Sequence, residues 1–241
     1  MTEITITENE YNQNNLLYLQ TTLSELLTRA DCQIKCSTMG KRYKFQLTCP
    51  DYYSDIIRAE LIDKVAEIIA VNYKYQFFNN TIKVGGISRL ELEILYAGLI
   101  AADIEEDKRY AFEKIKSMKE FAIDGIFNFR LQPLKRKWTD VVSYMPGCFL
   151  TSQLHDFISY LLENKRKRVY IDDGKVYDNH YRRLKRNLLI GGDKAKIIRE
   201  VLISNCGEIE IKGEVPAEDE KYLKEFYGEK IFFRKVNGQN S

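Results

Sequence analysis

The segment Asn128-Phe129-Arg130-Leu131 contains the side chains with the clearest potential for chemistry. Arg130 follows Phe127 by three residues and precedes Leu134 by four, which places it beside an apolar helical stripe. A guanidinium in such a position is costly unless it is paired. We therefore expect Arg130, with Asn128 beside it, to bond a carboxylate or backbone carbonyls and to fix the helix packing. The alternative is that the two residues hold an anionic ligand.

Basic residues are concentrated between residues 128 and 200, where sixteen stand against eight acidic residues although the whole chain carries only +2. Aromatic residues are interleaved with them, and such a patch could follow a phosphate backbone and stack bases. Charge runs are more often solvated faces, and no helix-turn-helix, RRM or zinc-finger pattern is present. Nucleic-acid binding is therefore an alternative, and its candidate patch is Lys135, Arg136, Lys137, Lys165, Arg166, Lys167, Arg168, Arg182, Arg183, Lys185 and Arg186.

The common catalytic motifs are missing, so no catalytic residue is assigned. The chain has no Gly-x-Ser-x-Gly, His-Glu-x-x-His or Gly-x-Gly-x-x-Gly. The run Gly191-Gly192-Asp193-Lys194 lacks the phosphate-loop pattern, and we expect a turn between helices with Asp193 as the N-cap. This absence favours a protein that is not an enzyme.

The cysteines do not form a metal-binding pattern. Cys32, Cys36 and Cys49 are three where a structural zinc site needs four ligands, and His155 and His180 lie far away in sequence. We expect free, mostly buried thiols, no metal and no cofactor.

Composition indicates a packed protein of one or two domains. The 241 residues are 44% hydrophobic and 12% aromatic, which is enough to fill a core. No apolar run approaches the roughly 20 residues that span a bilayer. The start Met1-Thr2-Glu3-Ile4 is unlike a secretion signal, so we expect a cytoplasmic protein without a membrane span.

Periodicity predicts an α+β fold with a helical middle between small N-terminal and C-terminal α/β units. Residues 1–50 predict a strand, a helix and two strands around Met39-Gly40-Lys41. Residues 51–165 predict helices, with capping patterns at Ser88 and Asp103 and a break at Pro133. Residues 166–241 predict a hairpin at 172–174, a helix, and a strand–helix–strand unit over 207–234.

Several segments resemble the YtxC-like family, a group of uncharacterised proteins of endospore-forming bacteria. The run Asp124–Leu131 resembles that family's Gly-Phe-x-Asn-Phe-Arg-Leu signature, and His155–Leu162 resembles its Asn-Glu-Phe-Ile-x-Leu-Leu segment. The helix Asp63–Ala70 and the final order of elements up to Gly228–Ile231 are also similar. The chain departs from the family at Leu154–Phe157, where Tyr-Asn-Glu-Phe is typical, and at Pro133. The resemblance implies a role in sporulation and supplies no catalytic residue.

These observations lead to one principal hypothesis and two alternatives. The principal hypothesis is a cytosolic, sporulation-associated protein that works through an unknown protein partner and not as an enzyme. The first alternative is a nucleic-acid-binding protein that uses the basic region 130–199. The second is a small-anion binder or enzyme centred on Arg130. The sequence does not fix the oligomeric state.

Overall fold

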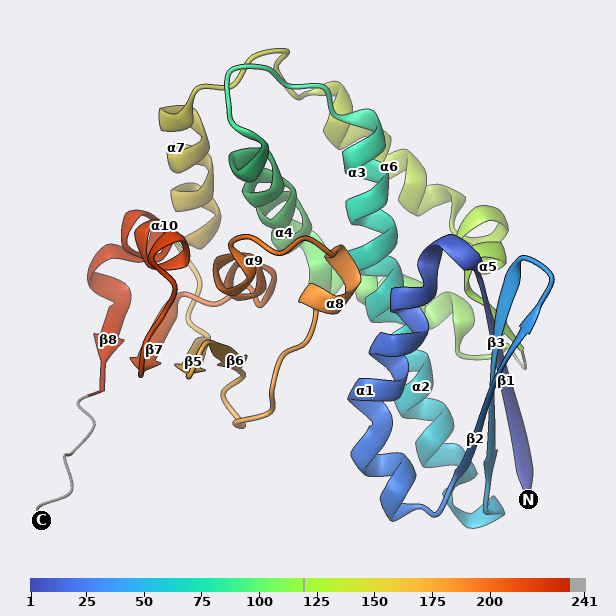
Figure 1. The fold of residues 1–241 in the computed structure, drawn as a ribbon. Coiled ribbons are helices and arrows are strands. Elements are labelled where there is room, and N and C mark those ends of the chain that lie inside the picture. Colours follow the sequence, from blue (N-terminus) through green and yellow to red (C-terminus); the bar gives the residue numbers. More distant parts are fainter. Residues whose placement is uncertain (119, 235–241) are drawn as a thin grey trace, which may run out of the picture. The chain divides into compact units, whose positions relative to one another are not determined.

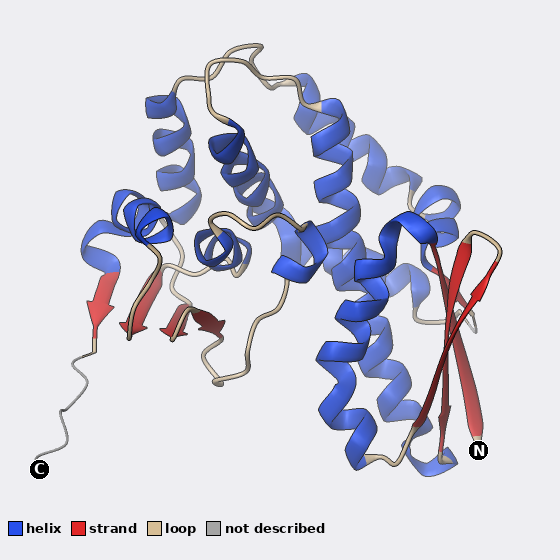
Figure 2. Cartoon of the chain, in the orientation of Figure 1, coloured by secondary structure: helices blue, strands red, loops and turns tan. Residues whose placement is uncertain are grey.

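The computed structural model describes residues 1–118 and 120–234, and they form the predicted α+β fold. Helices occupy the middle of the sequence, and a small sheet is formed toward each end of the chain (Figures 1 and 2). No helix among the described residues is long and apolar enough to cross a membrane.

The contacts divide the chain into two compact units, each built from segments that are distant in sequence. Unit 1 comprises Met1–Phe77, Ile104–Ser143 and Leu188–Ile190, and unit 2 comprises Phe78–Asp103, Tyr144–Asn187 and the chain from Gly191 onward. Both units draw on the helical segment predicted over 51–165. One boundary falls within helix α4 (Arg89–Ile115) at Asp103, where the backbone leaves the helical conformation with φ −140°. The capping pattern at Asp103 had predicted a fresh helix there.

Unit 1 contains a four-stranded sheet with the order β2-β3-β1-β4. Its strands are β1 (Thr2–Asn9), β2 (Gln33–Met39), β3 (Arg42–Cys49) and β4 (Phe121–Ala122). β3 pairs antiparallel with both β1 and β2, whereas β4 pairs parallel with β1. β2 and β3 meet at a two-residue turn in which Gly40 has φ +60°, a conformation that glycine adopts without strain. β4 was not predicted, because a strand of two residues is too short to show the alternation of buried and exposed side chains.

One face of this sheet forms the core of unit 1. Ile4 and Ile6 of β1 alternate with Thr5 and Thr7, so the isoleucines are buried and the threonines face the other side. The helices α1 (Gln13–Arg29) and α2 (Ser54–Ile68) lie beside the sheet in Figure 1. The remaining helical elements that contribute to unit 1 are the part of α4 from Ile104 onward, a π-helical turn (Ile69–Tyr73), α3 (Lys74–Thr81), α5 (Ile123–Arg130), α6 (Gln132–Ser143), α8 (Asn187–Ile190) and short 3-10 turns at Glu10–Asn12 and Asp51–Tyr53.

Unit 2 contains the second sheet, with the order β6-β5-β7-β8. Besides the part of α4 up to Asp103, unit 2 contains α7 (Thr151–Leu162), β5 (Arg168–Asp172), β6 (Lys175–Tyr177), α9 (Lys196–Ile203), β7 (Glu208–Lys212), α10 (Ala217–Tyr227), a 3-10 turn (Gly228–Lys230) and β8 (Ile231–Phe233). The antiparallel pairing of β5 with β6 confirms the predicted hairpin, and the parallel pairing of β7 with β8 confirms the strand–helix–strand unit.

Candidate functional site

Helix α5 carries the Asn-Phe-Arg-Leu motif and presents half of it to solvent. Ile126 and Phe127 are buried on the core side of the helix, while Phe129 is 81% exposed and Arg130 is exposed. The helix ends at Arg130, and Leu131, whose φ is −113°, takes the next buried position. Arg130 therefore does not lie against the core, and the expectation that it packs beside the apolar face was wrong.

Phe129 and Arg130 line a hollow of about 420 Å³ that we call the α5 hollow. The other lining residues come from β1, from the start of α5 and from the segment that leads into β4, and they are Thr5, Thr7, Met118, Glu120, Phe121, Ala122, Gly125 and Ile126. The hollow thus lies at the outward face of the β1–β4 pair, where hydroxyl groups alternate with the buried isoleucines. It combines apolar area, two threonine side chains, the carboxylate of Glu120 and the guanidinium of Arg130.

Arg130 makes no hydrogen bond or ion pair with any residue that the structure describes. The carboxylate of Asp124, on the same helix, is occupied by Arg42, whose two terminal nitrogens lie 2.5 and 3.0 Å from its oxygens. Bonding to Asp124 raises the pKa of the Arg42 guanidinium. Arg42 is thus the structural arginine of this region, whereas Arg130 has no ion-pair partner among the described residues.

Asn128 has a structural role. Its side-chain oxygen accepts a hydrogen bond from Lys135 Nζ at 2.9 Å, and its carbonyl accepts one from Gln132. The Lys135 ammonium also lies 4.3 Å from the ring centre of Phe127. These contacts tie α5 to α6 across the break at Pro133. The two candidate residues of the motif thus differ: Asn128 is bonded within the fold, and Arg130 is not bonded to any described residue.

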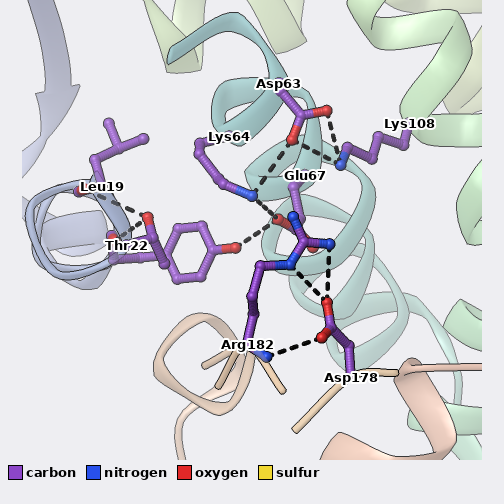
Figure 3. Close-up of polar contacts among 9 residues, drawn as sticks. Leu19, Thr22, Asp63, Lys64, Glu67, Lys108, Asp178 and Arg182 are labelled. Atoms are coloured by element: carbon purple, nitrogen blue, oxygen red, sulfur yellow. Dashed lines mark hydrogen bonds and ion pairs between the residues drawn. The ribbon is translucent and has the colours of Figure 1, made fainter. Parts of the chain in front are cut away.

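The basic candidates are divided between the two units. Lys135, Arg136 and Lys137 belong to α6 of unit 1, whereas residues 165–168 precede or open β5 and residues 182–186 follow β6 in unit 2. Lys137, Arg168 and Arg182 are paired with acids. Lys137 Nζ is 2.8 Å from both Glu106 and Asp107, Arg168 is 2.6 Å from Glu208, and Arg182 is 2.9 Å from Asp178, a pair drawn in Figure 3.

The other basic candidates in unit 2 include exposed and half-buried residues. Arg166, Lys167 and Arg183 are exposed, while Lys165, Lys185 and Arg186 are half-buried. Burial lowers the pKa of Lys185. Three tyrosines of the region gather, because the ring of Tyr181 lies 4.6 Å from that of Tyr170 and 6.0 Å from that of Tyr177. Nucleic-acid binding therefore stays a prediction, and a salt-dependent filter-binding assay tests it.

The loop Gly191–Ala195 surrounds a buried arginine that the sequence did not single out. Arg199, fully buried in α9, donates to the carbonyls of Gly192 and Ala195 at 3.3 Å and pairs with Glu93 at 3.3 Å. Every residue from Ile197 to Ile203 is buried, so helical spacing alone did not distinguish Arg199 from its apolar neighbours.

The N-terminus of α9 is capped by Asp219 of α10, and the prediction that Asp193 is the cap was wrong. Asp219 Oδ1 accepts the N–H of Ile198 at 2.8 Å, and burial raises the pKa of this carboxyl. Asp193 instead pairs with Lys196 at the surface at 2.9 Å. Because Asp219 already bonds the Ile198 N–H, that N–H at the start of α9 is not free to bind a phosphate.

A charged cluster in unit 1 links α1, α2 and α4 (Figure 3). Lys64 Nζ lies 3.3 Å from Asp63 and 3.4 Å from Glu67, and Lys108 lies 2.9 Å from Asp63. The hydroxyl of Tyr18 donates to Glu67 at 2.5 Å. Although burial lowers the pKa of Lys64, the charges of Glu67 and Asp63 raise it above its ordinary value. Each named charge has an opposite partner, so the cluster holds helices together.

A second buried network of unit 1 surrounds Glu8. Its carboxylate accepts hydrogen bonds from Asn15 at 2.8 Å, from the Tyr73 hydroxyl at 2.9 Å and from the backbone of Asn9 at 2.8 Å. Within the described residues it has no cationic partner. Burial raises the pKa of Glu8. The π-helical turn places Tyr73 in this network, a contact that sequence periodicity does not reveal.

The five cysteines are free, but the expectation that most are buried was wrong. Cys49 and Cys206 are buried, Cys32 is half-buried, and Cys36 and Cys148 are exposed. In the part of the chain that the structure describes, no group of three or more histidine, cysteine or acidic side chains is arranged to hold a metal ion.

Comparison with known proteins leaves the α5 hollow to be interpreted on its own chemistry: no family model, curated protein or solved structure matches the chain.

Proposed function

We propose that this chain is a non-enzymatic, cytosolic interaction protein that acts in sporulation and captures a protein partner at the α5 hollow. The observation that carries the proposal is the outward display of Phe129 and Arg130 around this hollow. The same two residues belong to the motif through which the chain resembles the YtxC-like family.

The chemistry of the hollow fits a peptide-like partner with an apolar side chain next to a carboxylate. Aromatic residues, phenylalanine among them, and arginine are enriched at protein interfaces relative to the rest of the surface. Arg130 forms no ion pair with an acid among the described residues. A carboxylate of the partner can therefore form a charge-assisted hydrogen bond with Arg130 without displacing an acid of this chain. The described lining residues include no histidine or thiol, which favours binding over catalysis.

Site-specific photocrosslinking in sporulating cells tests the proposal. A photoreactive phenylalanine analogue replaces Phe129 in one variant and Tyr52, which is 77% exposed in unit 1, in a matched control. We expect an adduct of defined mass from position 129 only. Adding Arg130→Gln abolishes that adduct. No adduct at position 129, or an adduct that is indifferent to Arg130→Gln, contradicts the proposal.

The unpaired state of Arg130 also favours a second candidate, a small anionic ligand. The two differ in what is sufficient for binding, because a small anion binds the purified chain without any protein. Calorimetric titration with phosphate, sulfate and small dicarboxylates supports this candidate if one of them binds and Arg130→Gln removes the binding.

A further inference from the structure

Strand β2 forms an open edge of the sheet in unit 1. Among the described residues it pairs with β3 alone, and six of its seven residues are exposed. A strand edge of this length offers a row of free N–H and C=O groups to another chain. Lys35 is the only charged residue of β2, so a single charge opposes pairing with another strand at this edge.

The turn that joins β2 to β3 fixes which backbone groups point outward. Met39 and Arg42 flank a two-residue turn, and the pair that closes such a turn is hydrogen-bonded. Hydrogen-bonded and non-hydrogen-bonded pairs then alternate along an antiparallel ladder. The N–H and C=O groups of Ile34, Cys36 and Thr38 therefore point away from β3, toward any strand that is added at this edge.

A groove of about 610 Å³ runs beside the same edge. Its lining includes Leu16, Leu17 and Gln20 of α1 and Cys36, Thr38 and Tyr43 of the hairpin. Leu17 is 48% exposed. Side chains alternate along a strand, so the groove lies on the face to which Ile34, Cys36 and Thr38 point.

We propose that β2 pairs antiparallel with β2 of a second copy of this chain, about a two-fold axis at Cys36. Cys36 is the central residue of Gln33–Met39, so this register uses the whole strand. The outward N–H and C=O groups of Cys36 then bond those of Cys36 in the second copy. The outward groups of Ile34 bond those of Thr38 in the second copy. The two four-stranded sheets become one continuous sheet.

The side chains of this register are compatible with self-pairing. Lys35 of one copy faces Ser37 of the other, so no two like charges lie directly opposite each other. Ile34, which is 39% exposed, comes to lie over Thr38 and enters the groove beside Leu17 of the second copy. The contact is isologous, as a closed dimer requires. Since one strand and one groove make a small interface, the dimer is concentration-dependent.

Sedimentation across a concentration series tests the pairing. The wild type is expected to pass from monomer to dimer. Thr38→Pro removes an outward N–H without touching a bond to β3, and it is expected to leave only monomer. Thr38→Val keeps that N–H and is expected to form the dimer, so it serves as the matched control.

A charge exchange identifies the register and remains decisive if Thr38→Pro does not fold. In the dimer, Ser37→Lys of each copy places an ammonium opposite Lys35 of the other copy, so the repulsion occurs twice. We expect dimerisation to weaken about tenfold. Adding Lys35→Glu puts opposite charges at the same two places and restores the dimer. Thermal melting of the dilute monomers shows that both variants fold.

Thiol crosslinking provides an independent measurement. Diamide takes two electrons and two protons from two thiols and leaves a disulfide, which the roughly 5.5 Å between paired Cα atoms allows. In a Cys148→Ser background we expect a covalent dimer that disappears when Cys36→Ser is added. A protein that stays monomeric at every concentration overturns the proposal. So does a dimer that is unaffected by Thr38→Pro and Ser37→Lys, or an edge that accepts only an unrelated extended peptide.

Discussion

The ammonium of Lys74 lies 2.7 Å from a carboxylate oxygen of Asp107, and neither side chain reaches solvent. Asp107 Oδ2 also accepts the indole N–H of Trp138 at 2.9 Å, and Oδ1 lies 2.8 Å from Lys137 Nζ. One carboxylate thus joins α3, α4 and α6 inside unit 1. Taking two charges out of water is costly, so the pair is tolerable only because each partner is satisfied.

The first prediction concerns this carboxylate. Asp107→Asn leaves the Lys74 ammonium buried without its counter-charge, and we expect the free energy of unfolding to fall by about 3 to 5 kcal/mol. Urea unfolding measures the change. Glu25→Gln, which removes an exposed ion pair with Arg29, is the control and should change stability by less than about 0.5 kcal/mol. Similar effects of the two variants would contradict the structural role of Asp107.

The sequence predicted the elements whose signals are local. The Ser88–Glu91 capping box is present, with Glu91 N–H donating to Ser88 Oγ at 3.2 Å and Ser88 N–H to Glu91 at 2.8 Å. α10 ends at Tyr227, and Gly228, whose φ is +48°, is its C-terminal cap, as predicted. Such signals act within one turn, so neighbouring residues are enough to reveal them.

The contacts that the sequence did not reveal join residues far apart in the chain. The Lys74–Asp107 pair, the cap of α9 by Asp219 and the short strand β4 all depend on packing between distant segments. For Arg130 the local pattern itself was misleading. Helical spacing predicted a position near the core, but the helix ends at that residue. Periodicity describes a helix interior and does not apply to its last residue.

The second prediction concerns the pH dependence that Glu8 produces. Burial raises its pKa in the folded state above the value in the unfolded chain, so the folded state binds the proton more tightly. The contribution of Glu8 to stability is therefore greatest below the unfolded pKa and is lost as the pH rises through the folded pKa. Relative to Glu8→Gln, the wild type should lose stability as the pH rises above about 4, the ordinary pKa of a glutamate, and through the raised pKa of the folded state. Urea unfolding of both proteins across that range measures the difference, and a difference that does not vary with pH would contradict the prediction.

The third prediction separates the two arginines near α5. Asp124→Asn weakens the bidentate pair with Arg42 and should cost about 1 kcal/mol of stability, because the pair is partly exposed. Arg130→Gln touches no internal partner among the described residues and should change stability by less than about 0.5 kcal/mol. Thermal and urea unfolding provide both values. A loss on Arg130→Gln as large as that on Asp124→Asn would assign Arg130 to the fold and remove the ground for a ligand at the α5 hollow.

The fourth prediction compares two aspartates near α9. Asp219 accepts the Ile198 N–H at 2.8 Å from a buried position, whereas Asp193 is exposed and pairs with Lys196 at the surface. Asp219→Ala leaves a buried N–H group of the first turn unsatisfied, so we expect a loss of about 1 to 2 kcal/mol. Asp193→Ala should leave stability close to that of the wild type, since an exposed ion pair is screened by solvent. Urea unfolding of the two variants ranks them directly. The reverse order would make Asp193 the cap and would reopen the loop at Gly191–Ala195 as an anion site.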